Sequence, residues 1–240
     1  MKLAQLLFTQ GFGTRRECAG LIDAELVAIE GVVCSEADRE VAPEGLNFSV
    51  RGEPWTYQER AFLVLNKPTG YECSQKPKHH ASVYSLLPPP LRQRGVQAIG
   101  RLDEDTTGVL LFTDDGALIH RLTSPRHHVA KVYEVTCKHP VDAAQVEHLK
   151  RGVLLHDENE TVCAAACVAT GPASLRLTLV EGKYHQVKRM VAAAGNRVEA
   201  LDRSDFGGVR VEALAPGAWR WLSDAEGRAV TEKRSAAIAP

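Results

Sequence analysis

A short polar loop that leads into a continuous apolar segment constrains this chain more than any other feature. Residues 100–113 read GRLDEDTTGVLLFT, so Asp103 lies shortly before the apolar residues 109–112. Three polar side chains after it can hydrogen-bond the local main chain: Asp105, Thr106 and Thr107. Gly108 would permit a tight exit from this turn. The pattern predicts a strand whose edge carries one carboxylate, which either stabilises its own turn or is available for chemistry.

Composition limits the class of protein. The chain has 240 residues, 44% of them hydrophobic and 25% charged, as in a soluble globular protein with two domains or one large domain and an appendage. Six cysteines without a disulfide-like spacing fit a reducing, cytoplasmic environment. The apolar start at residues 1–8 is too short and interrupted for a signal peptide, and no apolar run approaches a membrane span.

Four segments together suggest a family. Residues 100–113 resemble the catalytic motif of the pseudouridine synthases, in the branch that includes the small-subunit rRNA enzyme RsuA. Three further segments resemble motifs of that branch in the same order: LNKPTG at 65–70, TSPRHH followed by KVYEV within 123–135, and EGKYHQVKRM at 181–190. Because four ordered motifs match, the chain is identified as a member of this branch over about residues 60–222.

The resemblance implies three active-site residues. Asp103 matches the catalytic aspartate, Tyr133 the active-site tyrosine, and Lys188 the active-site basic residue, which is usually arginine in these families. In an extended segment Lys131, Tyr133 and Val135 share one face. Tyr133 would then place its ring and hydroxyl beside the catalytic carboxylate. Without the motifs, Tyr133 would be interpreted as a core residue and Lys188 as a solvent-exposed lysine.

The large part of the chain predicts an α+β fold. Apolar runs indicate strands at 61–65 and 109–112, and alternating leucines indicate one at 175–179. Helices are expected over 142–151, stopped by Gly152, and over about 187–194. The resemblance implies the pseudouridine synthase fold, a mixed, largely antiparallel sheet with a central cleft, here spanning residues 61–228.

The first fifty residues predict a separate unit. Residues 14–17 form a capping box, and short apolar segments follow, so residues 1–50 are expected to hold two helices and a small sheet. This unit resembles the alpha-L type RNA-binding domain, which implies that Arg15 and Arg16 contact RNA. The alternative is a packing domain with two solvated arginines. A linker at 51–60 and a C-terminal tail at 229–240 complete the expected organisation.

The implied reaction turns uridine into pseudouridine. The C1′–N1 bond breaks, the base turns, and C1′ joins C5; nothing is oxidised and no group leaves, so neither cofactor nor metal is expected. Asp103 must stay ionised in a cleft, which a cation such as Lys188 would favour. Attack on the substrate and removal of a sugar proton both remain open for Asp103. The target base must be extruded or already unpaired.

Charge gives partial support for an RNA substrate. The net charge is −1, with 6 Lys and Arg against 10 Asp and Glu in residues 1–60 and 23 against 20 in residues 61–240. Phosphate binding needs a local basic surface. Its expected members in the catalytic domain are Arg101, Arg121, Arg126, His127, Lys131, Lys183 and Arg189. We expect the basic residues after residue 120 to share one face with Lys188.

The sequence leaves several alternatives open. Cys163 with Cys167, or the histidines at 127–128, could bind a metal, although neither has partners at matching spacing. Asp103 and Asp105 could act as a hydrolase pair, or the fold could serve a non-catalytic RNA-binding factor. Within the synthase interpretation, the resemblance implies uridine 516 of 16S rRNA in an assembling small subunit, with a large-subunit rRNA uridine second. A monomer is expected.

Overall fold

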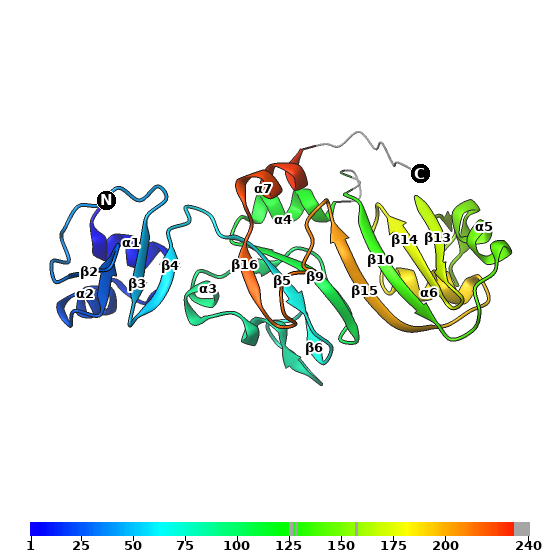
Figure 1. Cartoon of the computed structure of the whole chain (residues 1–240), viewed down its shortest axis with the longest axis horizontal. Coiled ribbons are helices and arrows are strands. Elements are labelled where there is room, and N and C mark those ends of the chain that lie inside the picture. Colours follow the sequence, from blue (N-terminus) through cyan, green and yellow to red (C-terminus); the bar gives the residue numbers. More distant parts are fainter. Residues whose placement is uncertain (125–126, 128, 157, 233–240) are drawn as a thin grey trace. The chain divides into compact units, whose positions relative to one another are not determined.

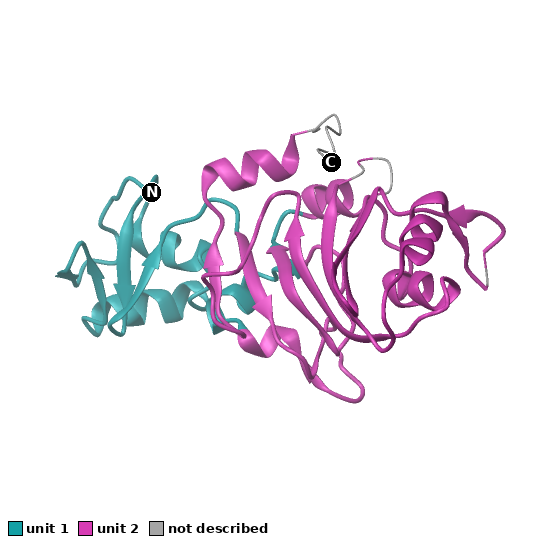
Figure 2. Ribbon diagram, turned by 45° about the vertical axis from the view of Figure 1, so that its right-hand side comes forward, with its two compact units in different colours: residues 1–61, 87–97, 113–115 teal, residues 62–86, 98–112, 116–240 magenta. Residues whose placement is uncertain are grey.

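The computed structural model describes residues 1–124, 127, 129–156 and 158–232, and the chain divides into two compact units (Figures 1 and 2). Unit 1 comprises residues 1–61, 87–97 and 113–115; unit 2 comprises residues 62–86, 98–112 and 116–240. The first unit therefore includes two short segments that the sequence placed in the catalytic domain. Each unit is described below by itself.

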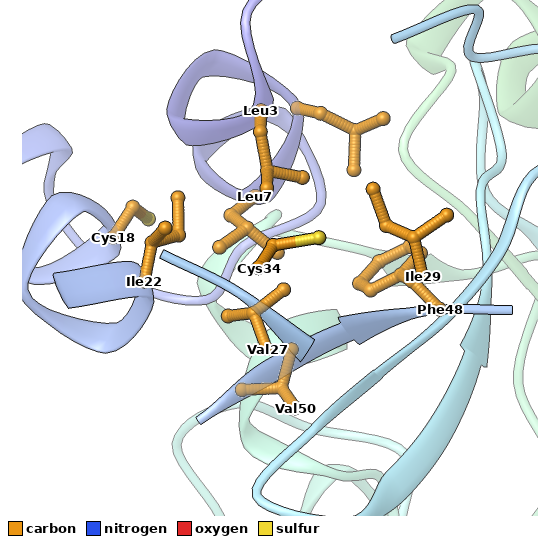
Figure 3. Packing of buried hydrophobic residues seen from close by; sticks show 10 residues of the cluster. Leu3, Leu7, Cys18, Ile22, Val27, Ile29, Cys34, Phe48 and Val50 are labelled. Carbon is orange, nitrogen blue, oxygen red and sulfur yellow. The ribbon is translucent and has the colours of Figure 1, made fainter. Parts of the chain in front are cut away.

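Residues 1–56 of unit 1 form two helices on a small antiparallel sheet, and a third helix of this unit, α3 (Pro89–Gln93), lies in the segment 87–97. The first two helices are α1 (Leu3–Thr9) and α2 (Arg15–Asp23). The strands, in sheet order, are β2 (Val32–Cys34), β1 (Val27–Ile29), β3 (Asn47–Val50) and β4 (Glu53–Thr56). Apolar side chains from the helices and strands meet in one core (Figure 3). The predicted arrangement of two helices and a small sheet is confirmed.

Local hydrogen bonds explain where α2 begins, and pairing with β3 adds a fourth strand to the sheet. The Thr14 hydroxyl accepts a hydrogen bond from the Glu17 amide at 3.3 Å, and the Glu17 carboxylate accepts one from the Thr14 amide at 2.7 Å, so the predicted capping box is confirmed. Residues 53–56, expected to be linker, instead form β4. This strand pairs with β3, and its Trp55 packs against the core.

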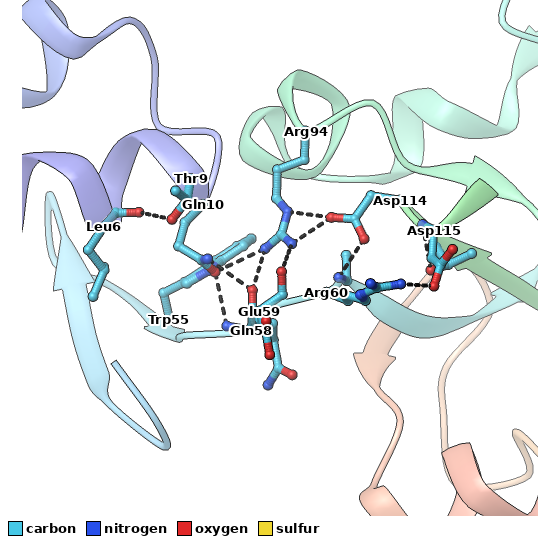
Figure 4. Close-up of polar contacts among 12 residues, drawn as sticks. Leu6, Thr9, Gln10, Trp55, Gln58, Glu59, Arg60, Arg94, Asp114 and Asp115 are labelled. Carbon is cyan, nitrogen blue, oxygen red and sulfur yellow. Dashed lines mark hydrogen bonds and ion pairs between the residues drawn. The ribbon is translucent and has the colours of Figure 1, made fainter. Parts of the chain in front are cut away.

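A buried glutamine connects the separate segments of unit 1. Gln10 is fully buried, and its Oε1 accepts hydrogen bonds from the Gln58 amide and from Arg94 Nη1, both at 3.1 Å (Figure 4). Arg94, which follows helix α3 (Pro89–Gln93), donates from Nε to Asp114 at 2.9 Å. Because buried polar groups need partners, these bonds hold residues 87–97 and 113–115 in this unit.

Unit 2 is built on an eight-stranded mixed sheet. Its main path runs β13 (Ala166–Gly171), β14 (Ser174–Leu179), β10 (Lys131–Cys137), β15 (Val198–Phe206), β9 (Thr106–Thr113), β5 (Phe62–Lys67) and β16 (Trp219–Trp221), and β8 (Gln97–Ala98) pairs with β9. The pairs β13–β14, β14–β10, β10–β15 and β5–β16 are antiparallel, and β15–β9 is parallel. The alternating leucines of β14 are buried, as predicted. The expected α+β fold with a largely antiparallel sheet is confirmed.

The described part of unit 2 adds four helices to this sheet: α4 (Gly116–Thr123), α5 (Ala143–Arg151), α6 (Gln186–Ala193) and α7 (Asp224–Thr231). Shorter elements are β6 (Tyr71–Glu72), β7 (Ala81–Ser82), a 3₁₀ turn at Val83–Leu86, β11 (Val153–Leu154) and β12 (Thr161–Val162). The predicted helices at 142–151 and 187–194 correspond to α5 and α6. Residues 229–231, expected in the tail, form the last turn of α7 because Val230 packs into the core. None of the helices in the described ranges has the length and apolar character needed to cross a membrane.

Candidate active site

A cavity of about 370 Å³ in unit 2 brings the predicted catalytic residues together. Its lining includes Asp103, Tyr133 and Lys188, which are far apart in the sequence. The other lining residues come from the segment 99–106, which includes the catalytic loop (residues 100–105), the end of α4, the start of β10 at Lys131, the segment 179–187 and strand β15. The volume lies within the usual range for small-ligand pockets, which suits a single nucleotide.

Asp103 is held by two basic side chains. Its Oδ2 lies 3.1 Å from Lys188 Nζ, and its Oδ1 lies 3.1 Å from His185 Nε2. The carboxylate side chain remains 26% exposed. Each oxygen therefore has a fixed partner while the group stays open to the cavity.

Both partners come from the beginning of helix α6. His185 precedes the helix with φ of 48°, a left-handed conformation that is rare outside glycine and costs free energy. Its ring stacks on Tyr184 with the centroids 3.8 Å apart. Residues three apart lie on one helical face, so this geometry directs His185 and Lys188 to the same carboxylate. His185 lies within the motif at residues 181–190, but no pattern in the sequence indicates its contact with Asp103.

Lys188 also contacts a second carboxylate. Its Nζ donates to Asp105 Oδ1 at 2.6 Å. Burial disfavours the charged forms of both groups, but their hydrogen bond and mutual attraction outweigh it. The pKa of Asp105 is therefore lowered and the pKa of Lys188 raised. Lys188 thus stays protonated between Asp103 and Asp105 across the neutral range.

A buried lysine supports the catalytic loop from behind. Lys67 is 0% exposed, and its Nζ donates to the main-chain carbonyls of Pro68, Glu104 and Thr106 at 2.9–3.1 Å. Burial lowers the pKa of this lysine, and nearby acidic groups counter the effect only in part. This contact explains physically why LNKPTG accompanies the Asp103 loop, a role that the sequence analysis missed.

Gly108 has a different purpose from the one predicted. It lies inside β9 with φ of 99°, opposite Arg203 of the parallel strand β15. A Cβ atom there would meet the Arg203 carbonyl oxygen at 2.3 Å. The glycine therefore permits two strands to approach closely, and it does not form the exit from a turn.

The cavity wall combines an aromatic ring with two cations. Tyr133 is 8% exposed on β10, and Lys131 lies two residues before it on the same face. Burial and, secondly, the charge of Arg203 lower the pKa of Lys131 to about 8, against the attraction of Glu181. Arg203 is 2% exposed; its Nε donates to the Val109 carbonyl at 2.8 Å, whereas its buried Nη2 has no hydrogen-bond partner among the described residues. The sequence analysis did not identify Arg203.

The predicted RNA-binding residues of unit 2 fall into two groups. Arg101, Lys131 and Lys183 line the cavity, and Arg189 lies next to Lys188 and donates to the Tyr184 carbonyl at 3.0 Å. Lys183 also pairs with Glu158 at 2.6 Å. Arg121 is not among the described residues that line the cavity, and it donates to the carbonyl of Thr231, the last residue of α7.

The remaining candidates lie elsewhere. His127 is described and donates its amide to the Ser124 carbonyl at 3.1 Å, whereas Arg126 and His128 lie outside the described residues. Arg15 and Arg16 are exposed at the start of α2 in unit 1, and the Arg15 guanidinium lies 4.8 Å from the centre of the Phe8 ring. Among the described residues, no three His, Cys, Asp or Glu side chains gather as a metal site requires.

The segment that carries the Asp103 loop, Tyr133 and Lys188 matches a known protein family. The family model for RNA pseudouridylate synthase matches residues 61–193. The chain belongs to this family and is a pseudouridine synthase.

Individual relatives resemble the chain over most of its length. It is 41% identical to the ribosomal small subunit pseudouridine synthase A of Escherichia coli (strain K12), over 90% of this chain and 94% of the relative. It is 39% identical to an uncharacterized RNA pseudouridine synthase of Bacillus subtilis (strain 168), over 94% and 96%. A crystal structure of a pseudouridylate synthase superposes with a TM-score of 0.68 and 34% identity, over 96% of this chain and 99% of that one.

Proposed function

We propose that this enzyme converts one uridine of 16S rRNA, uridine 516, to pseudouridine during assembly of the small ribosomal subunit. The observation that carries the reaction is the Asp103 carboxylate, held by His185 and Lys188 at the edge of a nucleotide-sized cavity. The substrate is supported by the Escherichia coli relative at 41% identity, which is named ribosomal small subunit pseudouridine synthase A.

The geometry suits the chemistry of the isomerisation. Asp103, fixed through both oxygens, either attacks the substrate or removes a proton from the sugar. Tyr133 presents its ring in the cavity, where it would stack on uracil and assist removal of the C5 proton. When the C1′–N1 bond breaks, negative charge develops on the base, and the nearby cations Lys131 and Arg203 would stabilise it.

The surrounding residues would hold the extruded nucleotide and its strand. Arg101, Lys131, Lys183 and Arg189 lie in or beside the cavity and are suited to phosphate contacts. His127 and, outside the described residues, Arg126 are proposed for the same role. In unit 1, Arg15 and Arg16 are proposed to contact RNA as well. We further propose that the enzyme acts as a cytoplasmic monomer.

Mapping of pseudouridine by carbodiimide modification and primer extension tests this function. The substrates are small-subunit particles and 23S rRNA from a host that lacks its own enzyme, and wild type is compared with Asp103→Asn. A single new stop at position 516, absent with the variant, is expected. A stop on 23S rRNA alone would assign a large-subunit substrate. No stop on either RNA, with RNA binding retained, would indicate a non-catalytic assembly factor.

A further inference from the structure

A lysine- and histidine-rich loop lies beside the catalytic loop without a role in the chemistry above. Residues 73–80, here termed the basic loop, read CSQKPKHH and connect β6 to β7. Its basic side chains are all exposed: Lys76, Lys78, His79 and His80. Glu72 is the only carboxylate in residues 71–82. Lys76 and Lys78 therefore present positive charge to solvent from a loop that contains no carboxylate of its own.

Glu72 gives this loop a defined shape. Its carboxylate accepts hydrogen bonds from the amides of Lys78, His79 and His80 at 2.8–3.1 Å. These bonds lower the pKa of Glu72 to about 2, so it stays ionised wherever the enzyme works. Because the Glu72 carboxylate accepts from main-chain amides, it does not pair with the ammonium groups of Lys76 and Lys78. At the other end of the loop, the Ser74 hydroxyl accepts from the Lys76 amide at 3.1 Å.

The basic loop is joined to the residues on both sides of Asp103. The Leu102 amide donates to Cys73 Sγ at 3.4 Å. On the other side, the Gly70 amide donates to the Glu104 carbonyl at 2.9 Å, and His80 Nε2 lies 3.9 Å from Glu104 Oε2. These contacts hold the basic loop next to the catalytic loop that carries Asp103.

We propose that the basic loop binds backbone phosphates of the RNA strand next to the uridine that enters the cavity. The proposal rests on the proposed function for the class of substrate and adds a surface that the cavity residues do not include. Lysine ammonium groups on an ordered loop bind phosphate as point charges, without reading the base. The surface would hold the strand while the target base leaves its stack.

The salt dependence of binding tests this proposal. Affinity for 16S rRNA is measured against salt concentration with the full chain carrying Asp103→Asn, so that no turnover occurs. Adding Lys76→Gln and Lys78→Gln should reduce the slope of log affinity against log salt by about 1.4, since each lost contact with single-stranded RNA removes about 0.7. At 0.15 M salt this reduction in slope corresponds to RNA binding about tenfold weaker than that of the Asp103→Asn parent.

A matched control has the same charge change elsewhere in unit 2. Lys138 follows the end of β10 opposite the site, and Lys150 lies on α5. Lys138→Gln with Lys150→Gln should leave both slope and affinity unchanged. A second readout is tryptic cleavage after Lys78: bound RNA should protect this bond, and Glu72→Ala should speed its cleavage in the free enzyme.

The possible outcomes separate this proposal from the proposed function. An unchanged slope in the basic-loop variant, while wild type forms pseudouridine, would overturn the proposal alone. Weaker binding to small-subunit particles but not to naked 16S rRNA would also overturn it, in favour of a protein partner. A reduced slope in an enzyme that modifies neither rRNA would support phosphate binding and reject the proposed function.

Discussion

The catalytic loop is held from two sides by two lysines in opposite environments. Behind it, Lys67 is fully buried and donates only to main-chain carbonyls. In front, the Lys188 side chain is 27% exposed and contacts the carboxylates of Asp103 and Asp105. The hydrogen bonds of Lys67 hold the main chain of the loop in place. The ammonium group of Lys188 favours the ionised forms of the two carboxylates. Substitutions at these positions should therefore separate stability from catalysis.

The largest effect is expected from Lys67→Met. The substitution keeps most of the side-chain volume but removes three hydrogen bonds to main-chain carbonyls, of which the one to Thr106 is buried. A buried group that loses its partner costs about 1–3 kcal/mol. Urea denaturation should show a loss of about 3 kcal/mol or more in the free energy of unfolding, accompanied by lost activity. A variant that retains wild-type stability would show that Lys67 is not the support of this loop.

Lys188→Met should give the complementary result. Removing the ammonium group leaves two carboxylates facing each other without a cation, so kcat should fall about 100-fold, or about 2.7 kcal/mol. Lys188→Arg preserves the charge and should recover most of the activity. Circular dichroism and urea midpoints should stay close to wild type in both variants. Equal kcat values for the Met and Arg variants would contradict a role for positive charge here.

A smaller, pH-dependent effect is expected at Lys131. Its pKa of about 8 means that it loses its proton as the pH rises through 8, whereas Lys188, with a raised pKa, stays charged. If the charge of Lys131 stabilises the base or a phosphate, kcat/KM should decline several-fold between pH 7.5 and pH 9. Lys131→Arg should remove this decline because arginine stays protonated. A decline of the same size in that variant would assign the titration to another group.

The elements that the sequence predicts well are those fixed by local chemistry. The capping box of α2 and the alternating leucines of β14 need only neighbouring residues to define them. The motifs also predicted that Asp103, Tyr133 and Lys188 belong to one site, and all three line the same cavity. Residues 53–56 and 229–231 were predicted poorly, because β4 and α7 depend on partners distant in the chain.

The residues that were missed owe their environment to tertiary contacts. A lysine at the end of a strand is normally solvated, and only the folded chain shows that Lys67 is enclosed by carbonyls of the catalytic loop. Arg203 is buried beside Val109 because β15 pairs with β9, and the same pairing explains Gly108. The contact of His185 with Asp103 depends on a left-handed backbone conformation that no local pattern indicated.

The catalytic role of Asp103 is tested most directly by comparison with Asp105, the neighbouring carboxylate that shares Lys188. Asp103→Asn and Asp105→Asn make the same chemical change, and single-turnover formation of pseudouridine in 16S rRNA particles measures both. We expect no detectable product with Asp103→Asn. Asp105→Asn should keep a rate within about tenfold of wild type, because of these two carboxylates only Asp103 lines the cavity. Equally severe losses would contradict the account and indicate that the two carboxylates act as a pair.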